Sequence, residues 1–365
     1  MNVFSAEKLS VGYGKKIIAA DISFQIEKGE ILTLIGANGS GKSTILKSIL
    51  LQLKTLSGNI YFENKNIHEM KRSEIAERIS AVMTDRITPE LMTCGDVVES
   101  GRYPYTNSLG ILSSDDKAKV REAMELVGVG NLFYTDFSCI SDGQRQRVML
   151  ARAICQDTDI LVLDEPTSFL DAHHKLELLN ILKKLVRERN LAVIMSLHEL
   201  DLAQKISDRI ICINNHTAEK IGTPEEIFSG DYINSLYNLK SNSFDCMYCS
   251  YELERPRGEP EVFVIAGGEV EIYRKLQRKN IPFAVGVIHE NSIEYPAVRA
   301  LATEIVTEKS FEPVSQQAIE KALEIMKRCS AVINNCPAWG TMNKKNSVLM
   351  EQAEKCGIPV YNSKK

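Results

Sequence analysis

Residues 36–44 read Gly-Ala-Asn-Gly-Ser-Gly-Lys-Ser-Thr, which is the spacing of a phosphate-binding loop. An apolar run at residues 31–35 precedes this loop, and a helical pattern begins near Lys42. In that order the backbone N–H groups and the helix N-terminus converge on one anion, Lys42 can reach the β- and γ-phosphates, and the Ser43 hydroxyl can ligate Mg²⁺. A glycine- and serine-rich turn that matches by chance is the alternative. We expect the chain to bind a nucleoside triphosphate.

Two further apolar runs end in residues that could act on the bound nucleotide. Residues 160–163 lead into Asp164 and Glu165, and residues 191–195 end shortly before His198. Asp164 could hold Mg²⁺ through water, Glu165 could polarise an attacking water, and the His198 imidazole could touch the γ-phosphate. Strands that alternate with helices and carry polar residues at their carboxyl ends predict a mostly parallel α/β sheet with its ligand at that edge.

Residues 141–147 read Ser-Asp-Gly-Gln-Arg-Gln-Arg and precede a helical run at residues 148–153. A small polar residue and a glycine at the start of a helix can present a hydroxyl and backbone N–H groups to an anion. This segment is therefore a second candidate contact for phosphate.

Composition narrows the class of protein. The chain has 365 residues, for which about one domain per 150 residues predicts two or three domains. The net charge of −4 disfavours a broadly cationic nucleic-acid binder, so we expect no nucleic-acid partner. No apolar run reaches the roughly 18 residues that span a bilayer, and the first residues lack the order of a secretory signal. Nine cysteines at scattered spacings indicate a reducing compartment, not a disulfide framework.

The pattern changes along the chain and suggests two domains. Residues 73–128 are mainly helical, with an amphipathic helix at 115–127 after a Ser-Ser-Asp cap. Residues 239–260 lose the apolar periodicity and are predicted to be a linker between domains at 1–238 and 261–365. In the second domain we expect a glycine turn at Gly267-Gly268 followed by a helix at 269–278. Strands are expected there at 262–266, 283–288, 331–334 and 358–361.

In combination, these residues resemble the ATP-binding subunit of an ABC transporter over about residues 1–238. The resemblance implies a P-loop NTPase core with antiparallel β and helical subdomains, here followed by a small Rossmann-like α/β domain. It implies ATP and Mg²⁺ as cofactors, Mg²⁺ being held by Ser43 and Asp164, and Glu165, His198 and Lys42 as catalytic residues. Asp171 would belong to the D-loop. The ATP-binding residues would be Tyr13, stacked on adenine, and the loop residues Gly36, Ala37, Asn38, Gly39, Ser40, Gly41, Lys42, Ser43 and Thr44.

The chain carries one phosphate loop and one signature, so the resemblance implies a homodimer with two composite sites. Each site would take Ser141, Asp142, Gly143 and Gln144 from the other copy. Asp142 stands where the family usually has glycine. At the Q-loop, where the family has glutamine, the local pattern puts Thr84, whose side chain is shorter but whose hydroxyl could still contact water or Mg²⁺.

Residues 92–105 resemble the helical subdomain of importer ATPases for ferric siderophores, haem and cobalamin, most closely at Thr93, Val97 and residues 101–104. That likeness implies a separate permease, an indirectly coupled substrate-binding protein, and a cytoplasmic position on the inner face of the membrane. Alternatively, Tyr103 and Tyr105 are ordinary aromatics of the subdomain. An ABC-type ATPase without a permease, or a transporter ATPase for another substrate gated by a ligand of the second domain, are the rival hypotheses.

Three features of the second domain leave alternatives open. Gly267-Gly268 could host a phosphate, but the pattern does not complete a dinucleotide fingerprint and a plain tight turn is favoured. Cys246 and Cys249 have the gap of a metal knuckle but supply only two ligands, so a chance pair is favoured. His289-Glu290 and residues 339–343 could line a pocket whose ligand the sequence does not name.

Overall fold

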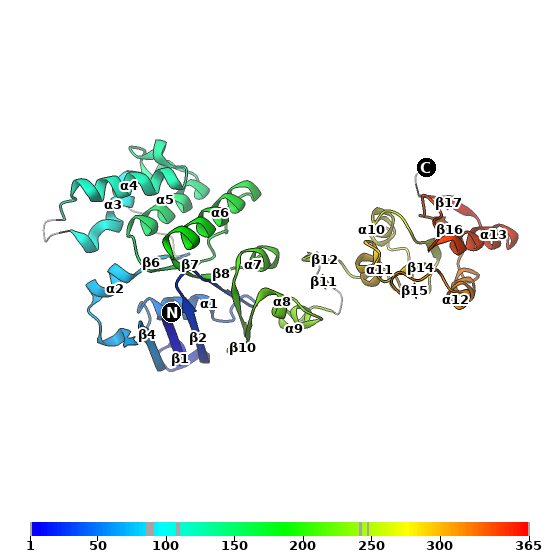
Figure 1. Cartoon of the computed structure of the whole chain (residues 1–365), viewed down its shortest axis with the longest axis horizontal. Helices are drawn as coiled ribbons and strands as arrows, with labels where there is room; N and C mark the ends of the chain where they lie inside the picture. The colour runs from blue at the N-terminus through cyan, green and yellow to red at the C-terminus, as the bar shows by residue number, and fades with distance from the viewer. Residues whose placement is uncertain (1, 85–90, 107–109, 241–242, 247, 364–365) are drawn as a thin grey trace. The chain divides into compact units, whose positions relative to one another are not determined.

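The computed structural model describes residues 2–84, 91–106, 110–240, 243–246 and 248–363. The chain separates into two compact units, Met1–Tyr237 and Asn238–Lys365 (Figure 1). Among the described residues, no helix combines the length and the apolar character that crossing a bilayer requires. Each unit is described by itself.

The described part of the first unit is built on one sheet with the order β5-β4-β1-β2-β10-β9-β3-β8-β7-β6. One half is largely antiparallel, and there β1 pairs with both β2 and β4. In the other half β9, β3, β8, β7 and β6 run parallel. The strands are β1 (Asn2–Tyr13), β2 (Lys16–Glu27), β3 (Ile31–Ile35), β4 (Ser57–Phe62), β5 (Lys65–Asn66), β6 (Ile79–Val82), β7 (Ile160–Asp164), β8 (Ala192–Ser196), β9 (Arg209–Asn214) and β10 (Thr217–Gly222).

The central parallel strands are buried on both faces, which explains their continuous apolar sequences. Every residue of β3, β7 and β8 is buried. Because these three strands are parallel neighbours, their carboxyl ends lie at one edge of the sheet. The polar residues that follow each strand are thereby brought together, as the sequence predicted.

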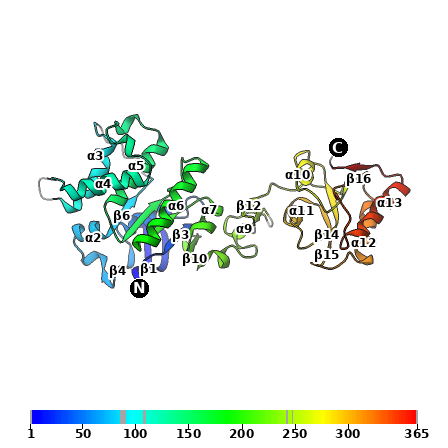
Figure 2. The same cartoon turned by 45° about the horizontal axis from the view of Figure 1, so that its top comes forward.

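Helices follow the strands at this edge and pack around the sheet. The helices and 3₁₀ turns of the first unit are α1 (Lys42–Ile49), η1 (Ile67–Glu69), α2 (Arg72–Arg78), α3 (Cys94–Glu99), η2 (Ser100–Tyr105), α4 (Ser114–Leu126), η3 (Gly130–Leu132), η4 (Phe137–Cys139), α5 (Asp142–Cys155), α6 (Ala172–Arg189), α7 (Leu200–Ile206), α8 (Pro224–Ile227) and α9 (Tyr232–Leu236). Helices α3, α4 and α5 gather into one helical group (Figure 2).

The expected helical stretch at 73–128 is interrupted by a strand. Strand β6 lies inside it and pairs in parallel with β7. A four-residue strand at the end of a sheet has too short an alternation to stand out against the helical pattern around it. The expected amphipathic helix is present as α4, and the Ser113 hydroxyl caps it by accepting from the Asp116 N–H.

The second unit is a five-stranded parallel sheet with the order β15-β14-β13-β16-β17. The chain enters at the central strand and changes direction between β13 and β16, which is the switch point at which open α/β sheets bind ligands. The strands are β13 (Val262–Ile265), β14 (Phe283–His289), β15 (Glu304–Glu308), β16 (Ala331–Asn334) and β17 (Val360–Asn362).

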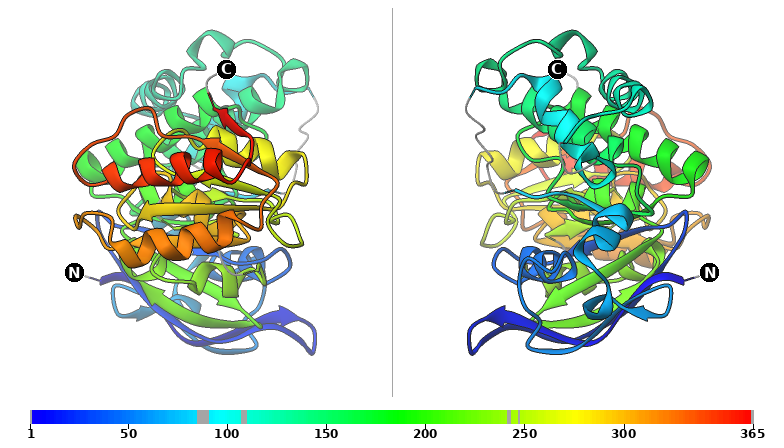
Figure 3. Two further views of the ribbon diagram at one scale, coloured as in Figure 1. Left: turned by 90° about the vertical axis from the view of Figure 1, so that its right-hand side faces the viewer. Right: turned by 90° about the vertical axis from the view of Figure 1, so that its left-hand side faces the viewer.

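Two apolar clusters cover the two faces of this sheet. Phe263 and Ile265 of β13 pack with α12 (Gln316–Met326) and α13 (Ser347–Lys355), which follows the turn η5 (Lys344–Asn346). Val264, from the opposite face, packs with α10 (Glu271–Arg278) and α11 (Tyr295–Leu301). The left view of Figure 3 looks onto α12 and α13 in front of the sheet.

In the second unit, two strand features were not predicted. The segment expected to be a linker contains a short antiparallel hairpin, β11 (Phe244–Asp245) and β12 (Ser250–Tyr251), within the second unit. Its strands are too short to give a periodic signal. Strand β15 is an edge strand whose sequence, Glu-Ile-Val-Thr-Glu, holds only two consecutive apolar residues, so it was also missed.

Candidate active site

The phosphate loop joins β3 to α1, as the sequence predicted. Gly41 precedes the first turn of α1 with a φ of 106°, a conformation that favours glycine and leaves the helix N-terminus without a side chain over it. A Cβ atom on Gly36 would lie 2.2 Å from the Ile213 carbonyl oxygen, so a glycine is required there too. The loop therefore keeps its backbone N–H groups accessible to an anion.

Lys42 lies over this loop. Its side chain is buried, and Nζ donates to the carbonyl oxygens of Gly36 at 2.7 Å and Ala37 at 3.2 Å. Burial lowers the pKa of Lys42, while the charges of Glu165 and Asp164 act in the opposite direction. The amine is thus held at the loop, with two carboxylates close enough to favour its charged form.

Asp164 ends β7 and accepts hydrogen bonds from three other residues of the site. Its Oδ1 accepts from the hydroxyls of Ser43 at 3.1 Å and Ser196 at 2.7 Å, and its Oδ2 accepts from Thr84 at 2.5 Å. The carboxylate is buried, and the three hydroxyls come from α1, from the end of β8 and from the segment after β6. A carboxylate beside serine and threonine hydroxyls is an oxygen donor set that fits Mg²⁺.

Glu165 and His198 meet beside the phosphate loop. The Nε2 atom of His198 lies 2.6 Å from Oε1 of Glu165, and the Ser168 hydroxyl donates to Oε2 at 3.1 Å. The Glu165 N–H donates to Ser196 at 2.9 Å, which fixes the backbone where the chain leaves the sheet. This carboxylate is held by two side chains and lies at the end of a rigid strand.

A cavity of about 560 Å³ lies between the phosphate loop and the pair formed by Glu165 and His198. Loop residues form one side, and Glu165 and His198 form the other. The lining residues are Ile18, Asn38, Gly39, Gly41, Lys42, Ser43, Thr44, Glu165 and His198. A triphosphate on the loop would place its last phosphate near both a carboxylate and an imidazole, which is the arrangement that attack by water requires.

The sequence did not identify Ser196 as part of this site. Its hydroxyl donates to Asp164 and accepts from the Glu165 N–H, so it links two candidate site residues. The available signal was a polar residue that ends an otherwise apolar strand. Tyr13 lies at the end of β1 with about half of its side chain exposed, at 53%, and its surface can stack on a ring.

The four signature residues lie at the start of α5, and one of them, Asp142, lines a separate hollow with Thr84 and Glu165. Ser141 caps the helix, because its hydroxyl accepts from the Gln144 N–H while the Gln144 side chain accepts from the Ser141 N–H. None of the four is among the described residues that line the cavity. Asp171 likewise caps α6 by accepting from the His174 N–H at 2.9 Å.

The segment at 101–105 is partly structural. The Arg102 side chain is buried, donates to Asp116 at 2.8 Å and to the Cys155 carbonyl at 2.7 Å, and places its guanidinium 3.9 Å from the centre of the Tyr105 ring. Hydrogen bonds from Ser113, together with Arg102, lower the pKa of Asp116 against the effect of burial. Tyr103, by contrast, is 76% exposed. Arg102 therefore holds the helical group together, while Tyr103 is presented on its surface.

In the second unit, a carboxylate already occupies the amides of the glycine turn. Glu294 is buried and accepts backbone hydrogen bonds from Gly267 and Gly268, and Tyr273 donates to its Oε2 at 2.6 Å. This arrangement supports the plain turn over a phosphate site.

The described residues contain no group of three potential metal ligands, and the structure pairs no cysteine, Cys246 and Cys249 included, in a disulfide. His289 bonds the Glu312 carbonyl at 2.8 Å.

Comparison with known proteins finds similarities in both parts of the chain. Residues 19–168 match the ABC transporter family model, and residues 283–364 match the model of the MJ0874 family. An uncharacterized ABC transporter ATP-binding protein of Methanocaldococcus jannaschii is 40% identical over 287 residues, which cover 78% of this chain and 99% of that protein.

Two more similarities concern iron and metal chelates. The iron(3+)-hydroxamate import ATP-binding protein of Bacillus subtilis is 36% identical over 239 residues, covering 66% of this chain and 89% of that protein. A solved structure of a metal-chelate type ABC transporter in an inward-facing conformation aligns with a TM-score of 0.57 and 26% identity, covering 65% of this chain and 89% of that chain. These similarities show that the chain belongs to the ABC transporter family as an ATP-binding subunit, and that it is an ATPase.

Proposed function

We propose that this ATPase powers an importer for ferric siderophores or related metal chelates, through a separate permease and a substrate-binding protein. The observation that carries the proposal is the 36% identity, over 239 residues, to an iron(3+)-hydroxamate import ATP-binding protein. That relative is matched over 89% of its own length, so the similarity covers nearly a whole importer subunit. Haem and cobalamin are further candidates within the same class of metal chelate.

The proposed chemistry is hydrolysis of the terminal phosphate of ATP. Lys42 and the loop N–H groups hold the β- and γ-phosphates, and Tyr13 stacks on the adenine. Ser43 and Asp164 are the proposed holders of Mg²⁺, which when bound neutralises charge on the phosphate oxygens. Glu165 orients and polarises the attacking water, and His198 keeps the carboxylate of Glu165 in place through its 2.6 Å contact.

Each active site is proposed to need a second copy of the chain. Ser141 and Gly143 lie at the N-terminus of α5, where hydroxyl and backbone N–H groups favour an anion. Because they do not line the cavity of their own chain, we infer that they close the cavity of a partner copy across bound ATP. Asp171, at the start of α6, would lie in the same interface. ATP would stabilise the homodimer and hydrolysis would release it.

A hollow of about 640 Å³ in the first unit is the proposed contact for the permease. Its lining is partly apolar and includes Leu50, Leu51, Ile75 and Arg152. The Arg152 side chain donates to Ser100 at 3.0 Å, which connects the hollow to the segment that resembles importer subunits. A partly apolar hollow that is also lined by polar and charged residues suits a short amphipathic helix from a membrane protein. This contact would hold the chain at the cytoplasmic face of the membrane.

The test is ATP hydrolysis by the chain reconstituted with candidate permeases in lipid. Substrate-binding proteins loaded with ferric hydroxamate, haem or cobalamin are added one at a time, and their unloaded forms serve as controls. Stimulation by the ferric hydroxamate complex is expected. Hydrolysis that no loaded binding protein stimulates would reject the chelate importer and favour an ATPase that is uncoupled, or one gated through its second unit.

A further inference from the structure

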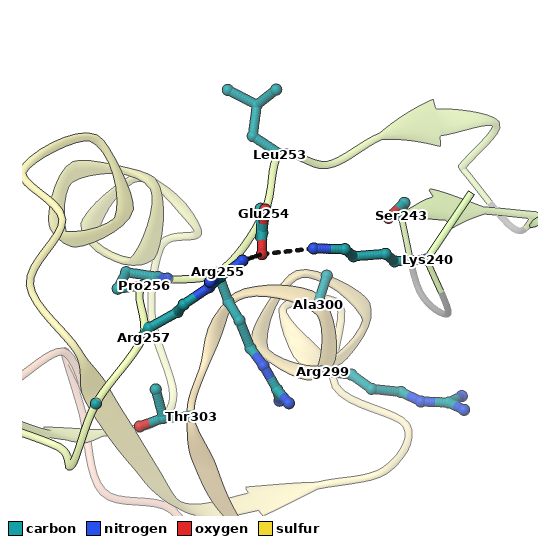
Figure 4. Close-up of a pocket in the computed structure, with 11 residues that line it drawn as sticks. Lys240, Ser243, Leu253, Glu254, Arg255, Pro256, Arg257, Arg299, Ala300 and Thr303 are labelled. Atoms are coloured by element: carbon teal, nitrogen blue, oxygen red, sulfur yellow. Dashed lines mark hydrogen bonds and ion pairs between the residues drawn. The ribbon is translucent and has the colours of Figure 1, made fainter. Parts of the chain in front are cut away.

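We propose that the second unit carries a binding site for a small polyanion, outside the ATP site. A hollow of about 610 Å³ lies between the segment after the β11–β12 hairpin and the end of α11 (Figure 4). Such a volume is typical of small-molecule sites. The lining residues are Lys240, Ser243, Leu253, Glu254, Arg255, Pro256, Arg257, Gly258, Arg299, Ala300 and Thr303.

Cationic side chains dominate this lining. The lining holds four cationic side chains, those of Lys240, Arg255, Arg257 and Arg299, and a single carboxylate, that of Glu254. Lys240 reaches Glu254 at 2.6 Å and Arg257 reaches it at 2.7 Å, from two sides (Figure 4). Hydrogen bonds from these two cations lower the pKa of Glu254 to about 2. The carboxylate stays ionised at neutral pH and holds two of the four cations in place.

The other two cations are available to a ligand. Arg255 and Arg299 extend away from Glu254 in Figure 4. Arg255 makes only a long contact, 3.4 Å, with the Ala302 carbonyl, and within the described part of the chain Arg299 forms no ion pair. Because an arginine always carries its charge, two guanidinium groups beside one hollow give it a persistent positive potential.

The backbone segments that line this hollow are bonded to the folded sheet and helices of the second unit. Glu252, just before the segment, is ion-paired with Arg274 of α10, and the Gln277 side chain donates to the Glu254 carbonyl at 3.3 Å. Pro256 is buried. On the opposite side, the Thr303 hydroxyl donates to the Phe283 carbonyl at 2.9 Å. The hollow therefore belongs to the folded sheet domain and not to a loose connection.

These features define the ligand by its chemistry. Guanidinium groups recognise phosphate and carboxylate through paired hydrogen bonds, and two of them at separate points favour an anion with at least two such groups. No aromatic side chain lines the hollow within the described residues, so charge and not ring stacking would select the ligand. We assign the site to a small molecule with two or more phosphate or carboxylate groups.

The test is calorimetric titration of the full chain with inorganic pyrophosphate and, separately, with citrate at fixed ionic strength. The Lys42→Ala variant is the parent, because the phosphate loop could otherwise bind pyrophosphate itself. We expect one of the two probes to bind once per chain, and the probe that binds identifies phosphate or carboxylate as the group recognised. Adding Arg299→Gln should weaken binding about tenfold or more. Arg278→Gln, an exposed arginine of α10 outside the hollow, should leave it unchanged.

Arg299→Lys keeps the positive charge but loses the paired N–H donors of the guanidinium group, so we expect an affinity between those of the parent and of Arg299→Gln. The fluorescence of the single tryptophan, Trp339, checks that each variant keeps its second unit folded. Absence of binding by both probes, or equal weakening by Arg299→Gln and Arg278→Gln, would overturn the proposal. So would binding to anionic lipid vesicles that needs Arg299 while neither probe binds, because that result would assign the cations to a membrane surface.

Discussion

His198 Nε2 lies 2.6 Å from Glu165 Oε1, so a side chain from the segment after β8 holds the carboxylate that follows β7. The Glu165 backbone is fixed as well, because its N–H donates to Ser196 at 2.9 Å. These contacts orient the carboxylate toward the cavity that Lys42 and Ser43 also line. The Glu165 carboxylate and the loop residues Lys42 and Ser43 therefore line one cavity.

Replacing Glu165 should separate ATP binding from hydrolysis. Glu165→Gln keeps the size of the side chain but removes its ability to accept a proton, so we expect the turnover rate to fall by about 10² or more. ATP binding should persist, and size-exclusion chromatography with ATP should show a trapped dimer. Glu188→Gln, an exposed glutamate of α6, is the matched control. Wild-type turnover in Glu165→Gln would remove this residue from the mechanism.

Thr84 should matter through its hydroxyl. It donates to Asp164 at 2.5 Å, so Thr84→Val leaves the shape nearly unchanged but takes one donor from the buried carboxylate. We expect the magnesium concentration for half-maximal hydrolysis to rise and the rate to fall by about tenfold, the effect of one such hydrogen bond. Thr84→Ser retains the donor and should behave like the wild type. Equal magnesium curves for all three proteins would show that Thr84 does not support Asp164.

The buried Arg102–Asp116 pair should stabilise the helical group of the first unit. Arg102→Met leaves Asp116 buried without its partner, for which we expect a loss of about 3–5 kcal/mol of unfolding free energy. Arg189→Met breaks the exposed pair with Glu122 and should cost about 1 kcal/mol or less. Hydrogen exchange across residues 94–126, followed by mass spectrometry, measures both. Similar protection in the two variants would contradict a structural role for Arg102.

Glu294 should make the stability of the second unit depend on pH. Burial raises the pKa of Glu294 above its ordinary value of 4.5, against hydrogen bonds from Tyr273 and the glycine turn. The folded state therefore binds a proton on Glu294 more tightly than the unfolded state does. The resulting contribution to the free energy of unfolding is complete below pH 4.5 and is lost as pH rises through the raised pKa.

Glu294→Gln should remove that dependence, because the amide does not titrate; its single oxygen accepts fewer of these hydrogen bonds, so stability should fall by a similar amount at every pH. Urea unfolding followed by Trp339 fluorescence between about pH 4.5 and pH 8 measures the second unit directly, since this tryptophan packs against its core. Glu351→Gln, at an exposed position of α13, should follow the wild type. Parallel pH profiles for the wild type and Glu294→Gln would contradict the burial of a titrating carboxyl.

The residues of the candidate ATP site that were proposed from the sequence are those that depend on single strands and turns. The predicted phosphate loop is a continuous strand, loop and helix, and Asp164, Glu165 and His198 were proposed as site residues because each follows an apolar run. Ser196 was missed because its role is to bond residues that are distant in sequence. Its place became visible only when β7 and β8 were paired.

The other features that were not predicted also depend on contacts between residues that are distant in sequence. Strands β6 and β15 are held by their neighbours in a sheet, while their own alternation is weak. Gly267-Gly268 has the composition of a phosphate turn, but whether its amides are open depends on Glu294, which arrives from the segment before α11. Arg102 looked like part of a surface motif, yet its buried carboxylate partner lies on α4.

Uptake of chelated radioactive iron into lipid vesicles tests the central claim most directly. The vesicles hold the permease with the chain on the side that receives ATP, and the loaded substrate-binding protein is on the other. The account predicts iron accumulation that requires ATP with the wild-type chain and that is lost with Glu165→Gln. Accumulation at the same rate with Glu165→Gln, or none with the wild type despite active ATP hydrolysis, would contradict a chelate importer powered by this site.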